Sequence, residues 1–96
     1  MKVLRLSPEY FCSPLWLETD DGVENIPTDA VDLPSPLREA LERWAADYAE
    51  TFQADDPGSS GFESPEAAAD FERVGSALAA ELSRVLGHSY RVLLRI

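Results

Sequence analysis

Cys12 and His88, the single cysteine and the single histidine of the chain, could in principle supply a nucleophile and its base. Neither residue has neighbours that mark a family of cysteine enzymes. His88 follows an expected helix end, a position that favours a surface or capping role. One cysteine and one histidine also fall short of the four nitrogen or sulfur ligands that a structural zinc site requires. The pair therefore predicts neither an active site nor a zinc site.

Carboxylates form the second set of candidate residues. Asp20, Asp21 and Glu24 could offer oxygen ligands to a hard cation, but their spacing does not match an EF-hand loop. Glu63 and Glu66 could do acid–base chemistry only in a cleft that buries one of them. The Gly58–Gly61 loop has no lysine and is a poor phosphate cradle. The sequence therefore predicts a protein that is not an enzyme, with no metal and no cofactor.

The charge is segregated along the chain. The segment from Glu18 to Glu72 contains sixteen carboxylates and two arginines, whereas the flanks contain six cations and two carboxylates, for a net charge of -10. Such a protein is repelled by nucleic acid and by anionic lipid, so neither is an expected partner. An acidic surface can attract a basic protein, as small immunity or inhibitor proteins do with basic toxins. Arginine-rich, acidic composition also arises without any function in GC-rich or salt-adapted genomes.

Length and composition indicate one small domain over residues 1–96. A lone cysteine excludes an internal disulfide and favours the cytoplasm. The first six residues contain too short an apolar run for a signal peptide, and no stretch approaches the roughly 20 apolar residues of a membrane span.

Alternation of apolar and charged residues predicts strands at 2–7, 15–18 and 90–96, and an acidic turn leads to a further short strand at 23–26. An irregular connector follows at 27–34, in which Val31 and Leu33 are expected to pack against the core.

Two helices are predicted, each opened by a Ser-Pro pair in which the serine caps the helix and the proline takes its first position. The first begins at Ser35 and the second at Ser64, and Gly87 ends the second. Gly75 is expected to allow close approach of the first helix under Trp44. The apolar stripes comprise Leu37, Ala40, Leu41, Trp44, Ala45, Tyr48, Ala49 and Phe52 in the first helix, and Phe71, Val74, Gly75, Leu78, Leu82, Val85 and Leu86 in the second.

These elements predict an α+β two-layer sandwich in chain order βββααβ. An antiparallel four-stranded sheet in the order 3-2-1-4 carries an antiparallel helix pair on one face.

The order of elements, with Trp16, the segment 44–48 and the segment 56–65 before Phe71, resembles a group of short acidic uncharacterised bacterial proteins. The likeness extends from about Pro14 to Gly87. It implies the architecture and assigns neither an activity nor functional residues.

The function expected from the sequence is non-catalytic binding, with a basic protein as partner and the acidic turn as the attracting element. The alternatives are self-association as a homodimer, small-ligand binding on the exposed sheet face, and an accessory subunit. The expected partner-binding residues are Asp20, Asp21, Glu24, Arg5, Trp16, Arg91 and Arg95. Strand alternation sends the last four to the face away from the helices, unless Trp16 turns inward and the arginines pair with nearby carboxylates.

Overall fold

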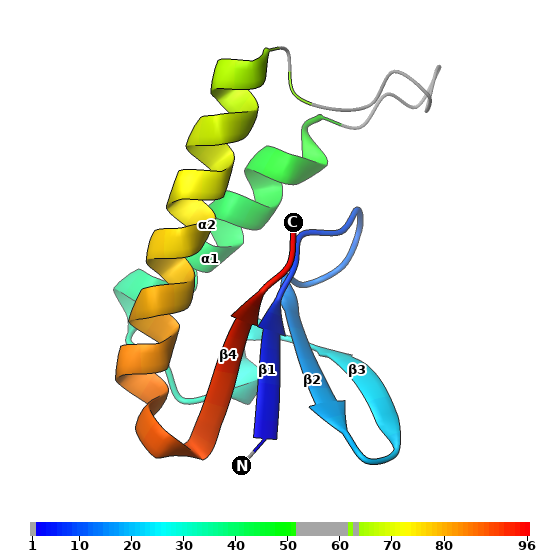
Figure 1. Ribbon diagram of the computed structural model, residues 1–96, viewed down its shortest axis with the longest axis vertical. Helices are drawn as coiled ribbons and strands as arrows, with labels where there is room; N and C mark the ends of the chain where they lie inside the picture. Colours follow the sequence, from blue (N-terminus) through cyan, green and yellow to red (C-terminus); the bar gives the residue numbers. More distant parts are fainter. Residues whose placement is uncertain (1, 52–61, 63) are drawn as a thin grey trace.

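The computed structural model describes residues 2–51, 62 and 64–96, and shows a four-stranded sheet with two helices on one side of it (Figure 1). The predicted α+β class and the strand order β3-β2-β1-β4 are confirmed. Most of the predicted interhelical loop, with Phe52 and Glu63, lies outside the described residues. The elements are β1 (Lys2–Leu6), β2 (Leu15–Thr19), β3 (Gly22–Ile26), the 3-10 turn η1 (Thr28–Ala30), α1 (Ser35–Ala49), α2 (Pro65–Leu86), the 3-10 turn η3 (Gly87–Ser89) and β4 (Tyr90–Leu94).

The prediction of a purely antiparallel sheet is wrong, because β4 pairs with β1 in parallel. The other two pairings, β1 with β2 and β2 with β3, are antiparallel as expected. In Figure 1, α2 descends beside the sheet and delivers the chain to the end at which β1 begins, so β4 runs in the direction of β1. Val31 and Leu33 of the 27–34 connector are buried as predicted. The prediction did not give the course of this connector, which passes behind the strands in Figure 1 to the start of α1.

The core lies between the sheet and the helix pair. Trp44 of α1 is 2% exposed and stacks on Phe71 of α2, with ring centroids 4.4 Å apart. Its indole Nε1 donates a hydrogen bond to the Phe71 carbonyl oxygen over 3.0 Å. Burying the tryptophan with its one polar atom satisfied avoids the cost of an unpaired donor. Residues of the core are Leu4, Leu6, Leu15, Ile26, Val31, Leu33, Leu37, Leu41, Trp44, Phe71, Leu78 and Leu82.

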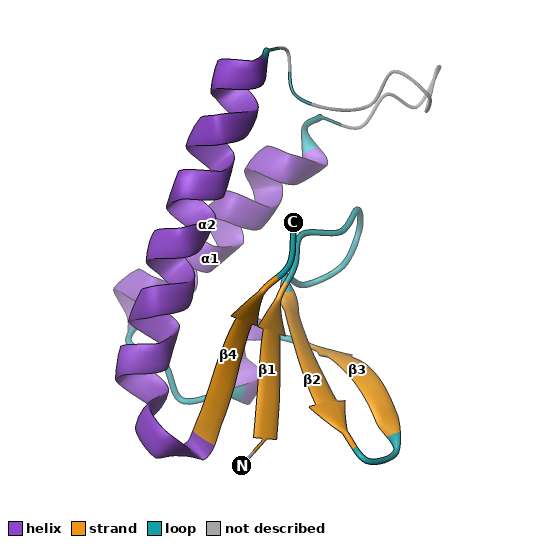
Figure 2. Cartoon of the chain, in the orientation of Figure 1, coloured by secondary structure: helices purple, strands orange, loops and turns teal. Residues whose placement is uncertain are grey.

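Three side chains of the predicted stripes are less buried than expected, and one of them is Ala49 of α1, which is exposed. Val74 is 48% exposed, so its place in the buried stripe of α2 is wrong. Tyr48 is half-buried, and its ring stacks on Tyr10 of the β1–β2 loop with centroids 4.8 Å apart. The 7–14 loop, drawn in teal beyond the ends of β1 and β2 in Figure 2, therefore reaches α1 and extends the apolar contacts past the sheet.

The two Ser-Pro helix starts differ. Ser64 caps α2 as predicted, since its hydroxyl accepts a hydrogen bond from the Ala67 amide over 3.1 Å. Ser35 is instead the first residue of α1, after Pro34, and no side chain caps that helix, so its predicted capping role is wrong. At the other end of α2, Gly87 has a φ of 61°, the left-handed conformation expected of a glycine after a helix.

Candidate functional site

The sheet face away from the helices presents two complete rows of side chains. Strand register places Val23, Glu18, Val3 and Arg91 in one row, and Asn25, Trp16, Arg5 and Leu93 in the next, each read from β3 to β4. Leu4, Leu6 and Leu15, the alternate residues, are fully buried on the helix side. Alternation along each strand therefore puts Trp16 on the outer face, where it is half-buried, and excludes the inward-turned alternative.

Arg5 and Trp16 form the centre of the outer face. The Arg5 guanidinium carbon lies 5.7 Å from the centroid of the Trp16 ring, within range of a cation–π interaction. The Trp16 Nε1 donates a hydrogen bond to the Ser7 carbonyl oxygen over 3.0 Å, which holds the indole across the end of β1. The Arg5 Nε is buried and has no hydrogen-bond partner among the described residues. These contacts give the centre of the face one defined, largely apolar shape.

Charge changes sign from one half of the sheet to the other. The β2–β3 hairpin, from Leu15 to Ile26, contains four carboxylates and no cation: Glu18, Asp20, Asp21 and Glu24. The neighbouring strands β1 and β4, with the residue after β4, contain four cations and no carboxylate: Lys2, Arg5, Arg91 and Arg95. On the outer face itself, strand register and alternation place Glu18 on β2 and three arginines, Arg5, Arg91 and Arg95, on the β1–β4 side, a relationship that the linear charge pattern does not reveal.

The partner-binding residues expected from the sequence do not all share this face. Asp20 and Asp21 occupy the exposed β2–β3 turn. Glu24 pairs with Leu17, so it points toward the helix side at the exposed sheet edge rather than to the outer face. Asn25, which the sequence interpretation did not select, lies on the outer face beside Trp16. Its side-chain amide donates to the Ser13 and Leu15 carbonyl oxygens over 2.8 and 3.0 Å, and so fixes the edge strand.

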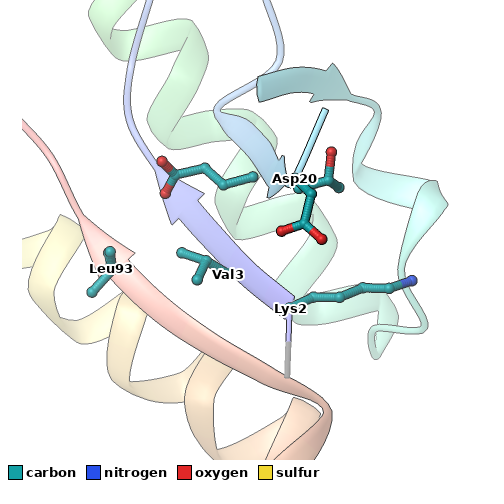
Figure 3. A pocket seen from close by; sticks show the side chains of 6 residues that line it. Lys2, Val3, Asp20 and Leu93 are labelled. Carbon is teal, nitrogen blue, oxygen red and sulfur yellow. The ribbon is translucent and has the colours of Figure 1, made fainter. Parts of the chain in front are cut away.

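A shallow depression lies on the outer face next to the hairpin turn. Figure 3 shows Val3 and Leu93 projecting from neighbouring strands, with Lys2 and Asp20 at the rim. Lys2, Val3, Glu18, Thr19, Asp20 and Leu93 form its lining. The mixture of one cation with two carboxylates has no preference for an anion or a cation, so the depression offers little to a small charged ligand.

The residues considered for catalysis are far apart. Cys12 is exposed in the loop after β1, whereas His88 precedes β4. Because β1 and β4 are parallel, these positions lie at opposite ends of the sheet, separated by strands of five residues or about 17 Å. A direct hydrogen bond between thiol and imidazole is excluded. Across residues 2–51, 62 and 64–96, no three His, Cys, Asp or Glu side chains are grouped to hold a metal ion. No helix in these ranges is long and apolar enough to cross a membrane.

A family model described as Serratia CdiI immunity protein-like matches residues 2–95. The match takes in all four strands and both helices, and the chain belongs to this family. A comparison with curated proteins finds no match.

Proposed function

We propose that this member of the Serratia CdiI immunity protein-like family is a non-catalytic immunity protein that binds a toxin and thereby neutralises it. The observation that supports this most strongly is the family match over residues 2–95, because it covers the whole fold rather than a short motif. An immunity protein acts as a stoichiometric binder, so it needs a recognition surface and no reactive group. The separation of Cys12 from His88 is compatible with that role, and an exposed free cysteine suits a reducing compartment such as the cytoplasm.

The toxin that suits this surface carries a basic patch, and the β2–β3 hairpin supplies the first attraction. Asp20, Asp21 and Glu24 are all exposed, and the described part of the chain contains no ion pair that uses them. A carboxylate cluster at the tip of a projecting hairpin accelerates the encounter with an oppositely charged protein. The net charge of -10 adds a longer-range attraction toward the same basic protein.

The immunity function is tested by growth. The chain and a candidate toxin domain, chosen by inspecting the genes that neighbour its own, are placed under separate inducible promoters in a host that lacks both. Expression of the toxin alone should stop growth, and co-expression of this chain should restore it, with a one-to-one complex recovered from the cells. Growth arrest in spite of abundant folded chain would refute the immunity function for that toxin.

The electrostatic part of the proposal is tested by association kinetics. Replacing Asp20, Asp21 and Glu24 together by lysine should lower the association rate constant about tenfold or more at low salt and change the dissociation rate constant much less. The same loss should shrink as salt rises, because exposed charges are screened beyond roughly 10 Å at 0.1 M.

The matched control carries the same change in net charge at another place. Glu39, Asp47 and Glu72 are exposed on the two helices, and their replacement by lysine should slow association less than the hairpin variant does. Equal rates for the two variants would assign the attraction to net charge alone. Rates that respond neither to salt nor to either variant would reject a basic partner while leaving the immunity function standing.

A further inference from the structure

We propose that the outer face of the sheet binds the outer face of a second copy of this chain, with the two-fold axis parallel to the strands. This surface is separate from the hairpin turn to which the toxin encounter is assigned. The inference rests on the two rows of side chains, on arginines that form no ion pair among the described residues, and on the position of Glu18 relative to those arginines.

The composition of the rows is that of a contact surface. Val3, Trp16 and Leu93 provide apolar area, and Arg5 is held against the Trp16 ring at the centre. Tryptophan and arginine are the residue types that contribute most often to interface hot spots, above all at the centre of a patch. Both helices lie on the opposite face of the sheet (Figure 1), so no helix of the described residues covers these side chains.

The arginines of this face form no ion pair within the described residues, although the chain is strongly acidic. Both ion pairs found in the described residues lie on α2, between Arg73 and Asp70 and between Arg84 and Glu81. Arg5, Arg91 and Arg95 take part in neither of them. Arginines without an ion pair, on a face that also carries the carboxylate of Glu18, are the arrangement expected when the matching charges come from another molecule.

Symmetry determines which halves meet. A two-fold rotation about an axis parallel to the strands, between two stacked sheets, reverses the strand order from 3-2-1-4 to 4-1-2-3. The three arginines of the outer face of each copy, Arg5, Arg91 and Arg95, then lie over the half of the other copy that contains Glu18. An in-plane axis perpendicular to the strands would instead place β4 over β4 and bring like charges together. Electrostatics therefore selects the first axis. Because the two copies are identical, each favourable contact between them occurs twice.

Strand register predicts the central contacts of this dimer. The chosen axis places β1 of one copy over β2 of the other and keeps each row of side chains opposite the same row of the other copy. In the row that contains Arg5 and Trp16, Arg5 of each copy therefore faces Trp16 of the other. In the row that contains Glu18, this residue faces Val3 of the other copy. Arg91 lies beside that Val3 on the neighbouring strand β4, so it is displaced from the position opposite Glu18 by one strand spacing of about 5 Å. Two symmetric Glu18–Arg91 pairs result, at the edge of an apolar and cation–π centre.

The dimer should be weak. Four strands about 4.8 Å apart with five residues rising about 3.3 Å each make a face of roughly 19 by 17 Å, or about 320 Å². This is less than half of the roughly 800 Å² that a standard interface covers on each partner, so association is expected only at high protein concentration. Repulsion between two copies of net charge -10 opposes association at low salt and is reduced at about 0.15 M, where the screening length is about 8 Å.

Sedimentation equilibrium at about 0.15 M salt tests the proposal, over concentrations from about ten micromolar to one millimolar. The average mass of the wild type should rise from 10.6 kDa toward twice that value. Glu18→Arg and Arg91→Glu should each weaken association about tenfold or more, and the double variant should recover most of the loss because the same pairs re-form with exchanged charges. Trp16→Ala with Arg95→Glu should abolish association.

The control exchanges charges outside the face. Arg43→Glu with Glu39→Arg on exposed positions of α1 should leave the mass unchanged, and melting curves identify any variant that fails to fold. A wild type that remains monomeric at the highest concentration would overturn the proposal, as would dimerisation that ignores all of the face variants. If the wild type is monomeric and the variants of the outer face lose toxin binding, the outer face is the toxin-binding surface. That result would also reject the dimer.

Discussion

A Cβ atom built on Gly75 of α2 would lie 2.7 Å from Cζ2 of Trp44, so the absence of a side chain at Gly75 lets the indole lie against the helix backbone. Contacts under 3.0 Å require a neighbour to move, and the Trp44 ring is held by stacking on Phe71 and by its hydrogen bond to the Phe71 carbonyl. The glycine expected from the sequence to accommodate Trp44 does so.

Gly75→Ala should destabilise the protein. Alanine improves helix propensity by about 1 kcal/mol, but overpacking of a held aromatic ring costs about 1 to 3 kcal/mol, so we expect a net loss of about 1 kcal/mol. Urea denaturation followed by circular dichroism measures the difference. Ser76→Ala, at the exposed neighbouring position, is the control and should keep or slightly raise stability. A more stable Gly75→Ala variant would mean that Trp44 can move away.

Trp44→Ala should lower the free energy of unfolding by about 3 to 5 kcal/mol, because it removes the largest fully buried side chain. That loss is a large fraction of the stability of a small domain. Trp44→Phe retains an aromatic ring against Phe71 but leaves the Phe71 carbonyl without its donor, and should cost about 2 kcal/mol. Thermal melts of the three proteins should therefore rank wild type, Phe and Ala in that order, and equal melting temperatures would contradict the described core.

Ser64→Ala and Ser35→Ala should have different effects although both serines precede a proline. The Ser64 hydroxyl accepts the Ala67 amide hydrogen bond, and its loss should cost about 1 kcal/mol. No side chain caps α1, so Ser35→Ala should change stability by less than about 0.5 kcal/mol. Chemical denaturation of the pair provides its own control. Equal losses would show that Ser35 caps α1 in solution.

Stability should decline at alkaline pH through Tyr48. Burial of the Tyr48 ring, together with the nearby Tyr10 and Glu9, raises the pKa of Tyr48 above its ordinary value of 10.0. The folded state then holds the phenolic proton to higher pH than the unfolded chain does, so the free energy of unfolding is unaffected below about pH 10 and falls as pH rises through the folded pKa. In denaturation series from pH 8 upward, Tyr48→Phe should show a shallower alkaline decline than the wild type. Parallel curves would exclude Tyr48 as a source of the decline.

Local patterns in the sequence determined the elements and the faces of the side chains. Period-2 alternation placed Arg5 and Trp16 on one side of the sheet and Leu4 and Leu15 on the other, because successive strand residues point to opposite faces wherever the strand lies. The helical period placed Trp44 and Phe71 in the core for the same local reason. The Ser64 cap and the Gly87 helix end likewise depend on a few adjacent residues.

Only the tertiary structure decided the direction of β4, and with it the arrangement of the candidate surface. A strand with alternating apolar residues buries its apolar face equally well in either direction. The direction of β4 therefore follows from the path of the 27–34 connector and of α2, which no local pattern encodes. That path brings Arg91 and Arg95 beside Arg5, opposite the carboxylates of the β2–β3 hairpin, and places Cys12 and His88 at opposite ends of the sheet. The net charge follows from the sequence alone. Which charged residues are neighbours on the surface depends on how the strands and helices are arranged, because those residues are distant in sequence.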